Sequence, residues 1–192
     1  MKKYTLYIIT TLILLASSVF SQTIYVSGDI TTNTTWAADT VKITGDVSVL
    51  DTVTLTINPG TYIEFQGYFE IQISGRLLAV GNVNDSITFT INDTTGYSVD
   101  SIFAGGWNGI WLTGAANVDT SIISYCNFEF CKGKTIYSTY NSKSIIEYNS
   151  LKNIHIGLSI ESNSFSIIRY NTIISCKESA IGCETVNYVY NK

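Results

Sequence analysis

The sequence predicts an all-β protein, a single-stranded right-handed parallel β-helix with coils of about 22 residues, on three observations. The composition is typical of strands, with 13 Tyr, 14 Gly, one Pro and only 14% charged residues. One motif recurs at nearly constant steps through the second half of the chain. Within each recurrence the apolar residues alternate with polar ones, which is the period of a strand and not of a helix. Coils of this kind bury their apolar side only when they stack on one another.

The recurring motif is a serine and two apolar residues that lead to a tyrosine. The copies read SIISYCNF, SIIEYNSL, SIIRYNTI and NYVYNK, and their aligned tyrosines are Tyr125, Tyr148, Tyr170 and Tyr190. The steps between them are 23, 22 and 20 residues. A second register, formed by TIYSTY, GLSIES and AIGCET, has steps of 22 and 23 residues. Two registers with one period indicate a single coil of chain that is repeated with small insertions.

The residue after each repeated tyrosine is expected to hold the coils in register. It is Cys126 in the first copy and then Asn149, Asn171 and Asn191. An asparagine side chain carries both hydrogen-bond donors and an acceptor, so stacked asparagines can bond from one coil to the next. We therefore predict a structural asparagine ladder inside a turn.

Three segments are predicted along the chain. Residues 1–21 have Lys2 and Lys3 ahead of an apolar run and are typical of a secretory signal peptide. Residues 22–50 are expected to form an N-terminal cap, and residues 51–192 the β-helix. The apolar run is short for a membrane span, and none is expected in the mature chain.

Charge and the position of the last residue indicate the class of partner. Loss of two lysines with the signal peptide changes the net charge from −4 to −6, which argues against nucleic acid as a partner. Export to the cell surface or the extracellular space is predicted, with the periplasm as an alternative. The sequence stops within a coil at Lys192, which predicts an N-terminal fragment of a longer protein with further C-terminal domains, and the alternative is a partner that pairs with the open edge.

The repeat units YNSL, YNTI and IGLSIESNSFSIIRYN resemble the pectate-lyase-like right-handed β-helix superfamily, in particular repeat proteins exported by bacteria. Upstream segments fit the same pattern in order, namely VTLTINPGTYIEF, ISGRLLAVG, SITFT and GGWNGIWL. The resemblance covers about residues 41–192. It implies the fold far more than an activity, because this fold hosts lyases, hydrolases, adhesins and inert scaffolds.

The resemblance also implies what a catalytic site would contain. Lyases of the superfamily hold calcium with clustered acidic residues and use an Arg or Lys as the base. Glu147 and Arg169 share a column one coil apart, as do Glu129 and Lys152. We interpret both pairs as exposed cross-strand ion pairs. The alternative makes Arg169 the base and Glu147 a calcium ligand.

Glu161 and Glu184 are the weak catalytic candidates. They share a column, and two carboxylates one coil spacing of about 5 Å apart repel each other unless a proton or a cation lies between them. Such a pair suits Ca²⁺, or an acid and a nucleophile in glycoside cleavage. The alternative is that both are solvated on the surface. No cofactor is required by this interpretation, Ca²⁺ is possible, and no other metal site is predicted.

Aromatic residues are the candidate ligand-binding set. Exposed rings in a row can stack on the apolar faces of sugars, although packing of ring on ring between coils explains the same pattern. Trp107, in GGWNG, is expected to be a packing residue. The predicted ligand-binding residues are Trp111, Tyr125, Tyr148, Tyr170 and Tyr190.

His155 and the cysteines show no pattern of a catalytic or zinc site. His155 is the only histidine, and the sequence shows no aspartate partner and no serine elbow for a hydrolytic triad. Cys126, Cys131, Cys176 and Cys183 contain no CxxC pair for zinc. We expect free thiols that fill the core, with a bridge between Cys176 and Cys183 as the alternative.

These observations favour an exported β-helix scaffold that binds a polysaccharide or another partner without catalysis. A polysaccharide lyase or glycoside hydrolase is the second hypothesis, since the superfamily includes both. A structural spacer or adhesin stalk of a longer protein is the third. Enzyme activity is left undecided, and the balance of the residues favours a non-catalytic protein.

Overall fold

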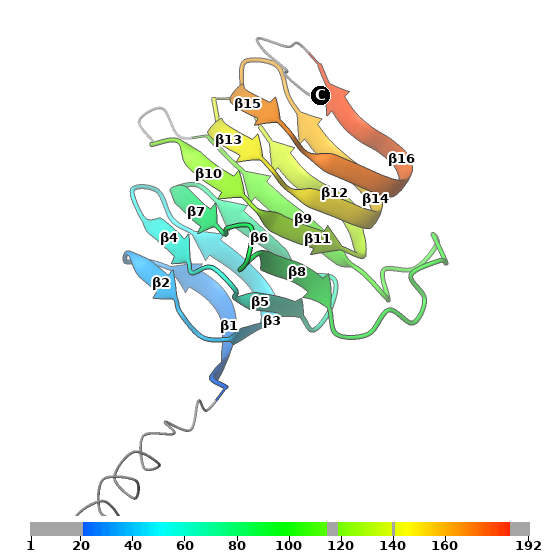
Figure 1. The fold of residues 1–192 in the computed structure, drawn as a ribbon, viewed down its shortest axis with the longest axis horizontal. Helices are drawn as coiled ribbons and strands as arrows, with labels where there is room; N and C mark the ends of the chain where they lie inside the picture. The colour runs from blue at the N-terminus through cyan, green and yellow to red at the C-terminus, as the bar shows by residue number, and fades with distance from the viewer. Residues whose placement is uncertain (1–20, 115–118, 140, 185–192) are drawn as a thin grey trace, which may run out of the picture.

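The protein is a parallel β-helix in the computed structural model, which describes residues 21–114, 119–139 and 141–184 (Figure 1). All strand pairs between the described residues are parallel, and neighbouring coils pair at steps such as Thr40–Tyr62, Ser121–Ser144 and Ser144–Ser166. There are about seven turns of about 23 residues, so the predicted fold class is confirmed. The strands are β1 Thr23–Ile30, β2 Thr34–Trp36, β3 Thr40–Val49, β4 Thr54–Ile57, β5 Tyr62–Phe65, β6 Glu70–Ile73, β7 Arg76–Val80, β8 Ile87–Ile91, β9 Trp107–Leu112, β10 Ser121–Ser124, β11 Cys126–Glu129, β12 Cys131–Ser138, β13 Lys143–Glu147, β14 Ser150–Ile160, β15 Phe165–Arg169 and β16 Thr172–Cys183.

The coil has three faces. Face 1 is the six-stranded sheet of β2, β4, β7, β10, β13 and β15. The other sheet bends around a corner, because the long strands β1, β3, β14 and β16 each contribute to two faces. Face 2 contains their first halves with β5, β8 and β11, and face 3 contains their second halves with β6, β9 and β12. Residues 23–49 already pair in parallel with the coils that follow.

The core is a stack of inward side chains from every coil. The predicted inward residues Ile146, Ile154 and Ile168 are fully buried. Aromatic rings stack along the axis, with 4.5 Å between the ring centroids of Phe65 and Trp107. Each buried side chain of this size contributes about 1.5–3 kcal/mol to stability, so the apolar stack accounts for most of the fold.

Two corners of the coil are made by single residues in the left-handed conformation. At the first corner, between faces 1 and 2, φ is 52° at Tyr125 and 56° at Tyr148 and at Tyr170. At the second, between faces 2 and 3, the equivalent residues are Phe130, Asn153 and Ser175, with φ of 57°, 52° and 58°. One such residue turns the chain sharply enough to pass from one face to the next without a loop. We name these the Tyr–Asn corner (residues 125–126, 148–149 and 170–171) and the Lys–His corner (residues 130–132, 153–155 and 175–177).

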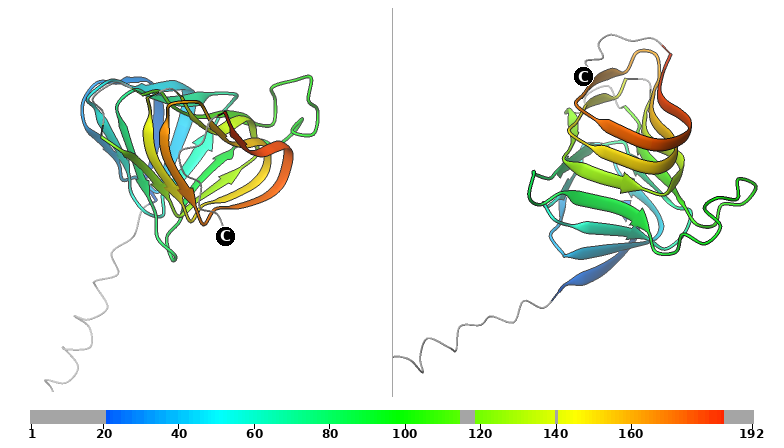
Figure 2. Two further views of the ribbon diagram at one scale, coloured as in Figure 1. Left: turned by 90° about the horizontal axis from the view of Figure 1, so that it is seen from above. Right: turned by 45° about the vertical axis from the view of Figure 1, so that its right-hand side comes forward.

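One coil carries a large insertion, residues 92–106, which lies between β8 and β9. Because of it, the paired residues Ile71 and Ile110 are 39 positions apart, whereas the pairs before and after them in the same column, Val47–Ile71 and Ile110–Ile136, are 24 and 26 apart. The insertion extends away from the stack of coils on the side of the Lys–His corner (Figure 2). In the part of the chain described, no helix has the length and apolar character needed to cross a membrane.

Candidate functional site

The repeated tyrosines stack on one another. Ring centroids are 5.0 Å apart between Tyr125 and Tyr148 and 4.9 Å apart between Tyr148 and Tyr170, with interplanar angles of 7° and 18°. Tyr148 is 43% exposed, but both faces of its ring meet a neighbouring ring. The parts of Tyr148 left to solvent are therefore its ring edges and its hydroxyl group, which are a poor surface for stacking on sugars. Tyr190 lies outside the described residues.

Asparagines next to these tyrosines connect three coils through hydrogen bonds. Asn149 accepts a hydrogen bond from the backbone N–H of Cys126 at 2.9 Å and donates to the carbonyl of Ile123 at 2.9 Å. The backbone N–H and the side chain of Asn149 both donate to Oδ1 of Asn171 at 3.0 Å, and Asn171 donates to the carbonyl of Ile146. Buried backbone groups at this corner are thus satisfied by the next coil. Asn191 lies outside the described residues.

On face 3, Glu161 is part of a compact polar group. Its carboxylate accepts a hydrogen bond from the hydroxyl of Tyr137, and Lys134 lies with Nζ 3.5 Å from the centroid of that ring. Trp111 packs edge-on against Tyr137 at 5.3 Å and is partly buried. Glu184 follows β16 and is exposed. Within the described residues, no three His, Cys, Asp or Glu side chains gather closely enough to hold a metal ion.

One of the two predicted cross-strand charge pairs, and the cysteines, occupy ordinary structural positions. Arg169 forms an ion pair with Glu147 on the neighbouring strand, at an exposed position of face 1. All four cysteines are free, so the alternative bridge between Cys176 and Cys183 is absent. Burial raises the pKa of Cys131 to about 12, which keeps this thiol protonated and unreactive.

The Lys–His corner brings together charged groups that the sequence does not place near one another. Asp100, in the insertion, forms an ion pair with Lys177, and its Oδ1 lies 3.8 Å from Nε2 of His155. The expectation that His155 has no aspartate partner is therefore wrong. It failed because the insertion packs against coils that lie more than fifty residues later in the sequence.

The surroundings of His155 favour its neutral form. His155 is 6% exposed, its Nε2 atom has no hydrogen-bond partner within the described residues, and the ring of Tyr97 packs against it at 5.4 Å. Burial, with a smaller contribution from Lys177, lowers the pKa of His155, although Asp100 and Glu178 oppose this shift. The neutral imidazole is therefore the stable form near neutral pH, and it serves as packing for the insertion.

A groove lies on the other flank of the insertion. It encloses about 620 Å³ of space open to solvent, between the end of β5 and the insertion. Phe103 stacks on Tyr68 with 4.4 Å between ring centroids and is 68% exposed, so its second face is free. The residues that line the groove are Gln66, Gly67, Tyr68, Ile91, Asn92, Asp93, Thr95, Phe103, Ala104, Gly105 and Gly106.

Amide and carboxylate groups stand beside the aromatic pair in this groove. The side chain of Asn92 donates to Oε1 of Gln66 at 3.2 Å. Hydrogen bonds from Thr95 hold the pKa of Asp93 below its ordinary value, so this carboxylate is ionised in any mild buffer. None of the residues that line the groove is Lys or Arg. An exposed ring face with hydrogen-bonding groups around it is the combination that binds uncharged polyhydroxylated ligands.

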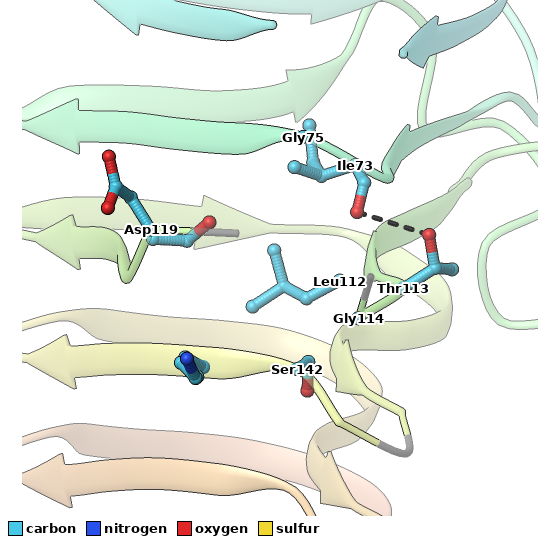
Figure 3. A pocket seen from close by; sticks show the side chains of 9 residues that line it. Ile73, Gly75, Leu112, Thr113, Gly114, Asp119 and Ser142 are labelled. Carbon is cyan, nitrogen blue, oxygen red and sulfur yellow. Dashed lines mark hydrogen bonds between the residues drawn. The ribbon is translucent and has the colours of Figure 1, made fainter. Parts of the chain in front are cut away.

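A second, smaller pocket lies where face 3 turns into face 1 (Figure 3). It encloses about 200 Å³, and two of the hydroxyl groups that line it are already bonded to backbone carbonyls. Thr113 bonds to the carbonyl of Ile73 at 3.1 Å, and Ser142 donates to the carbonyl of Thr139 at 2.6 Å. Both hydroxyl groups are therefore engaged within the protein, and Asp119, also in the lining, forms an ion pair with Arg76.

The groove residues were missed because they are outside the repeat. Residues 92–106 follow no coil period, and their only signal in the sequence is the break in spacing between two strand-like segments. An aromatic, an aspartate and paired glycines in such a break would have marked the segment for attention.

Comparison with known proteins supports the fold. Residues 41–191 match the family model described as the right handed beta helix region. No curated protein and no solved structure matches the chain. Since the matched segment covers well over half of the sequence, the chain belongs to the right-handed β-helix family.

Proposed function

We propose that this protein is an exported, non-catalytic β-helix scaffold that binds a polysaccharide in the groove between the end of β5 and the insertion. The observation that carries the proposal is the exposed face of Phe103, which is supported from behind by Tyr68. A ring held in this way offers a rigid apolar surface at little entropic cost, and sugar rings stack on such surfaces. Signal-peptide character in residues 1–21 supports export.

The groups around the ring favour a neutral glycan. Gln66 and Asn92 supply amide donors and acceptors, and ionised Asp93 accepts hydrogen bonds from sugar hydroxyls. A uronate polysaccharide would bring carboxylates to a groove that has one already and is lined by no Lys or Arg. Neutral glucans, mannans and xylans are therefore the expected class, and polygalacturonate is not.

The test is affinity electrophoresis of the full chain through gels that contain either neutral polysaccharides or polygalacturonate. We expect retardation by a neutral glycan, and about tenfold weaker binding by Phe103→Ala, as loss of a stacked ring predicts. Phe165→Ala is the matched control, because Phe165 is a similarly exposed phenylalanine on β15 of face 1. Equal retardation of both variants would place the binding surface elsewhere.

The polysaccharide lyase or hydrolase hypothesis retains one supporting arrangement, on face 3. Lys134, Tyr137 and Glu161 form a contacting group of an amino group, a phenol and a carboxylate, and Glu184 follows in the next coil. Reducing-end release from the same panel of glycans, with and without Ca²⁺, tests it. A chain that neither binds nor cleaves any glycan would support the third hypothesis, a spacer.

A further inference from the structure

The ammonium group of Lys132 lies inside the insertion. Lys132 is the second residue of β12 at the Lys–His corner, and its side chain bonds to the backbone of the insertion. Four backbone carbonyls accept hydrogen bonds from Nζ, and we call them the carbonyl cup. They belong to Gly96 at 2.7 Å, Val99 at 2.9 Å, Ile102 at 2.9 Å and Ala104 at 2.7 Å.

The carbonyl cup coordinates the ammonium group of Lys132 as a binding site coordinates a cation. A lysine has three N–H hydrogens, so four carbonyls at these distances must share them, as carbonyls do around a monovalent ion. Lys132 is only 9% exposed. A buried charge is tolerated when dipoles replace the water that it loses, and here the replacement comes entirely from one short loop.

Besides the carbonyl cup, the insertion is held by the ion pair of Asp100 with Lys177 and by a few ring contacts. Its large apolar side chains Val99, Ile102 and Phe103 are exposed instead of packed beneath it. Tyr97 is the main ring that packs inward, edge-on to Phe130 with 5.3 Å between centroids. A loop whose apolar groups face solvent depends on its polar contacts for order. Two members of the cup, Ile102 and Ala104, flank Phe103 in the chain, so the cup fixes the backbone that presents this ring.

We propose that Lys132 is the positioning residue of the glycan groove: a tethered ammonium that folds the insertion around itself and sets Phe103 in place. The vacated carbonyl cup would accept a free primary alkylammonium ion. The link to Phe103 rests on the proposed function, whereas the order of the insertion does not depend on it.

Chemical rescue of Lys132→Ala in the full chain is the test. The alanine keeps Cβ, and n-propylammonium supplies the missing three carbons and the N–H donors. We expect proteolysis within residues 92–106 to become about tenfold faster in Lys132→Ala and to return toward the wild-type rate with n-propylammonium. Affinity for a neutral glycan should fall and recover in parallel.

Three controls isolate the mechanism. Tetramethylammonium has the same charge without N–H donors and should not rescue. Lys132→Met replaces the lysine with an uncharged side chain of similar length. The insertion of this variant should therefore be cleaved rapidly with or without n-propylammonium. Lys152→Ala removes an exposed lysine from the next coil and should behave as the wild type.

Several results would overturn the proposal. They are unchanged proteolysis in Lys132→Ala, no rescue by n-propylammonium, or equal rescue by tetramethylammonium. If Lys132→Ala fails to fold, acylation of the wild-type lysines decides instead: Lys132 should react at least about tenfold more slowly than Lys152, and equal rates would contradict the cup. A chain that binds no glycan but shows rescued loop order would refute the proposed function and keep the role of Lys132 in the loop.

Discussion

The two corners of the coil share one backbone conformation but differ in the contacts of their side chains. Each is turned by one residue with positive φ in three successive coils. At the Tyr–Asn corner two of those coils repeat the same pair, tyrosine then asparagine, and each coil supplies the hydrogen bonds that its neighbour needs. At the Lys–His corner the outward residue changes in every coil, from Lys132 to His155 to Lys177.

The difference shows where a repeat protein has room for function. Stacked rings and a hydrogen-bond ladder satisfy the Tyr–Asn corner internally, so it needs nothing from outside the coils. At the Lys–His corner the insertion supplies the partners of the charged groups, namely Asp100 for Lys177 and the carbonyl cup for Lys132. Repetition stabilises the scaffold here, and the departure from it creates the candidate site.

The largest effect is expected from breaking the ladder. Asn149→Leu keeps the shape of the side chain but leaves the buried N–H of Cys126 without its acceptor and removes the donor to the carbonyl of Ile123. The free energy of unfolding should fall by about 3 kcal/mol, since each unsatisfied buried group costs about 1–3 kcal/mol. Urea denaturation of the full chain measures it.

Asn127→Leu is the control for this experiment, because Asn127 faces outward on the neighbouring strand β11. If both substitutions have equally small effects, the ladder contributes little, and the repeated asparagine would need another explanation.

A smaller effect is expected from the stacked tyrosines. Tyr148→Leu removes two ring contacts and keeps a side chain that meets the same backbone strain, so about 1–2 kcal/mol of stability should be lost. Tyr25→Leu, at an exposed site on β1, serves as the control. Glycan affinity should not change, because the groove lies beyond the other corner. If Tyr148→Leu abolishes binding while Phe103→Ala does not, the tyrosine column is the binding site.

The smallest effect concerns pH at the Lys–His corner. The pKa of His155 is lowered in the folded state, so the unfolded chain takes up a proton first as pH falls below about 6.5, and stability is lost there. His155→Gln should lose less stability than the wild type between pH 7 and pH 5.5, by a fraction of the ~1.4 kcal/mol that one pKa unit represents. Urea midpoints at several pH values measure this difference. Since the chain has a single histidine, parallel pH profiles would show that burial of His155 has no energetic consequence.

Local patterns were sufficient to predict the scaffold. The period of the tyrosines and the alternation around Ile146 and Ile168 predict stacked coils, and these residues are buried as expected. The fold class follows because a coil contacts only its neighbours, so the repeat spacing contains nearly all of the topology. The groove could not be predicted in the same way, because Phe103 and Tyr68 meet across a break in that spacing.

The sequence by itself determined that this chain is a β-helix, which residues face its core, and which residue types recur at one of its corners. Only the tertiary structure decided that Asp100 would lie beside His155, that Lys132 would enter the insertion, and that Phe103 would have a free face above Tyr68. The physical reason is the range of the contacts. Contacts between coils repeat at one spacing and are visible as a period, whereas the insertion closes over coils far along the chain at separations that no period encodes.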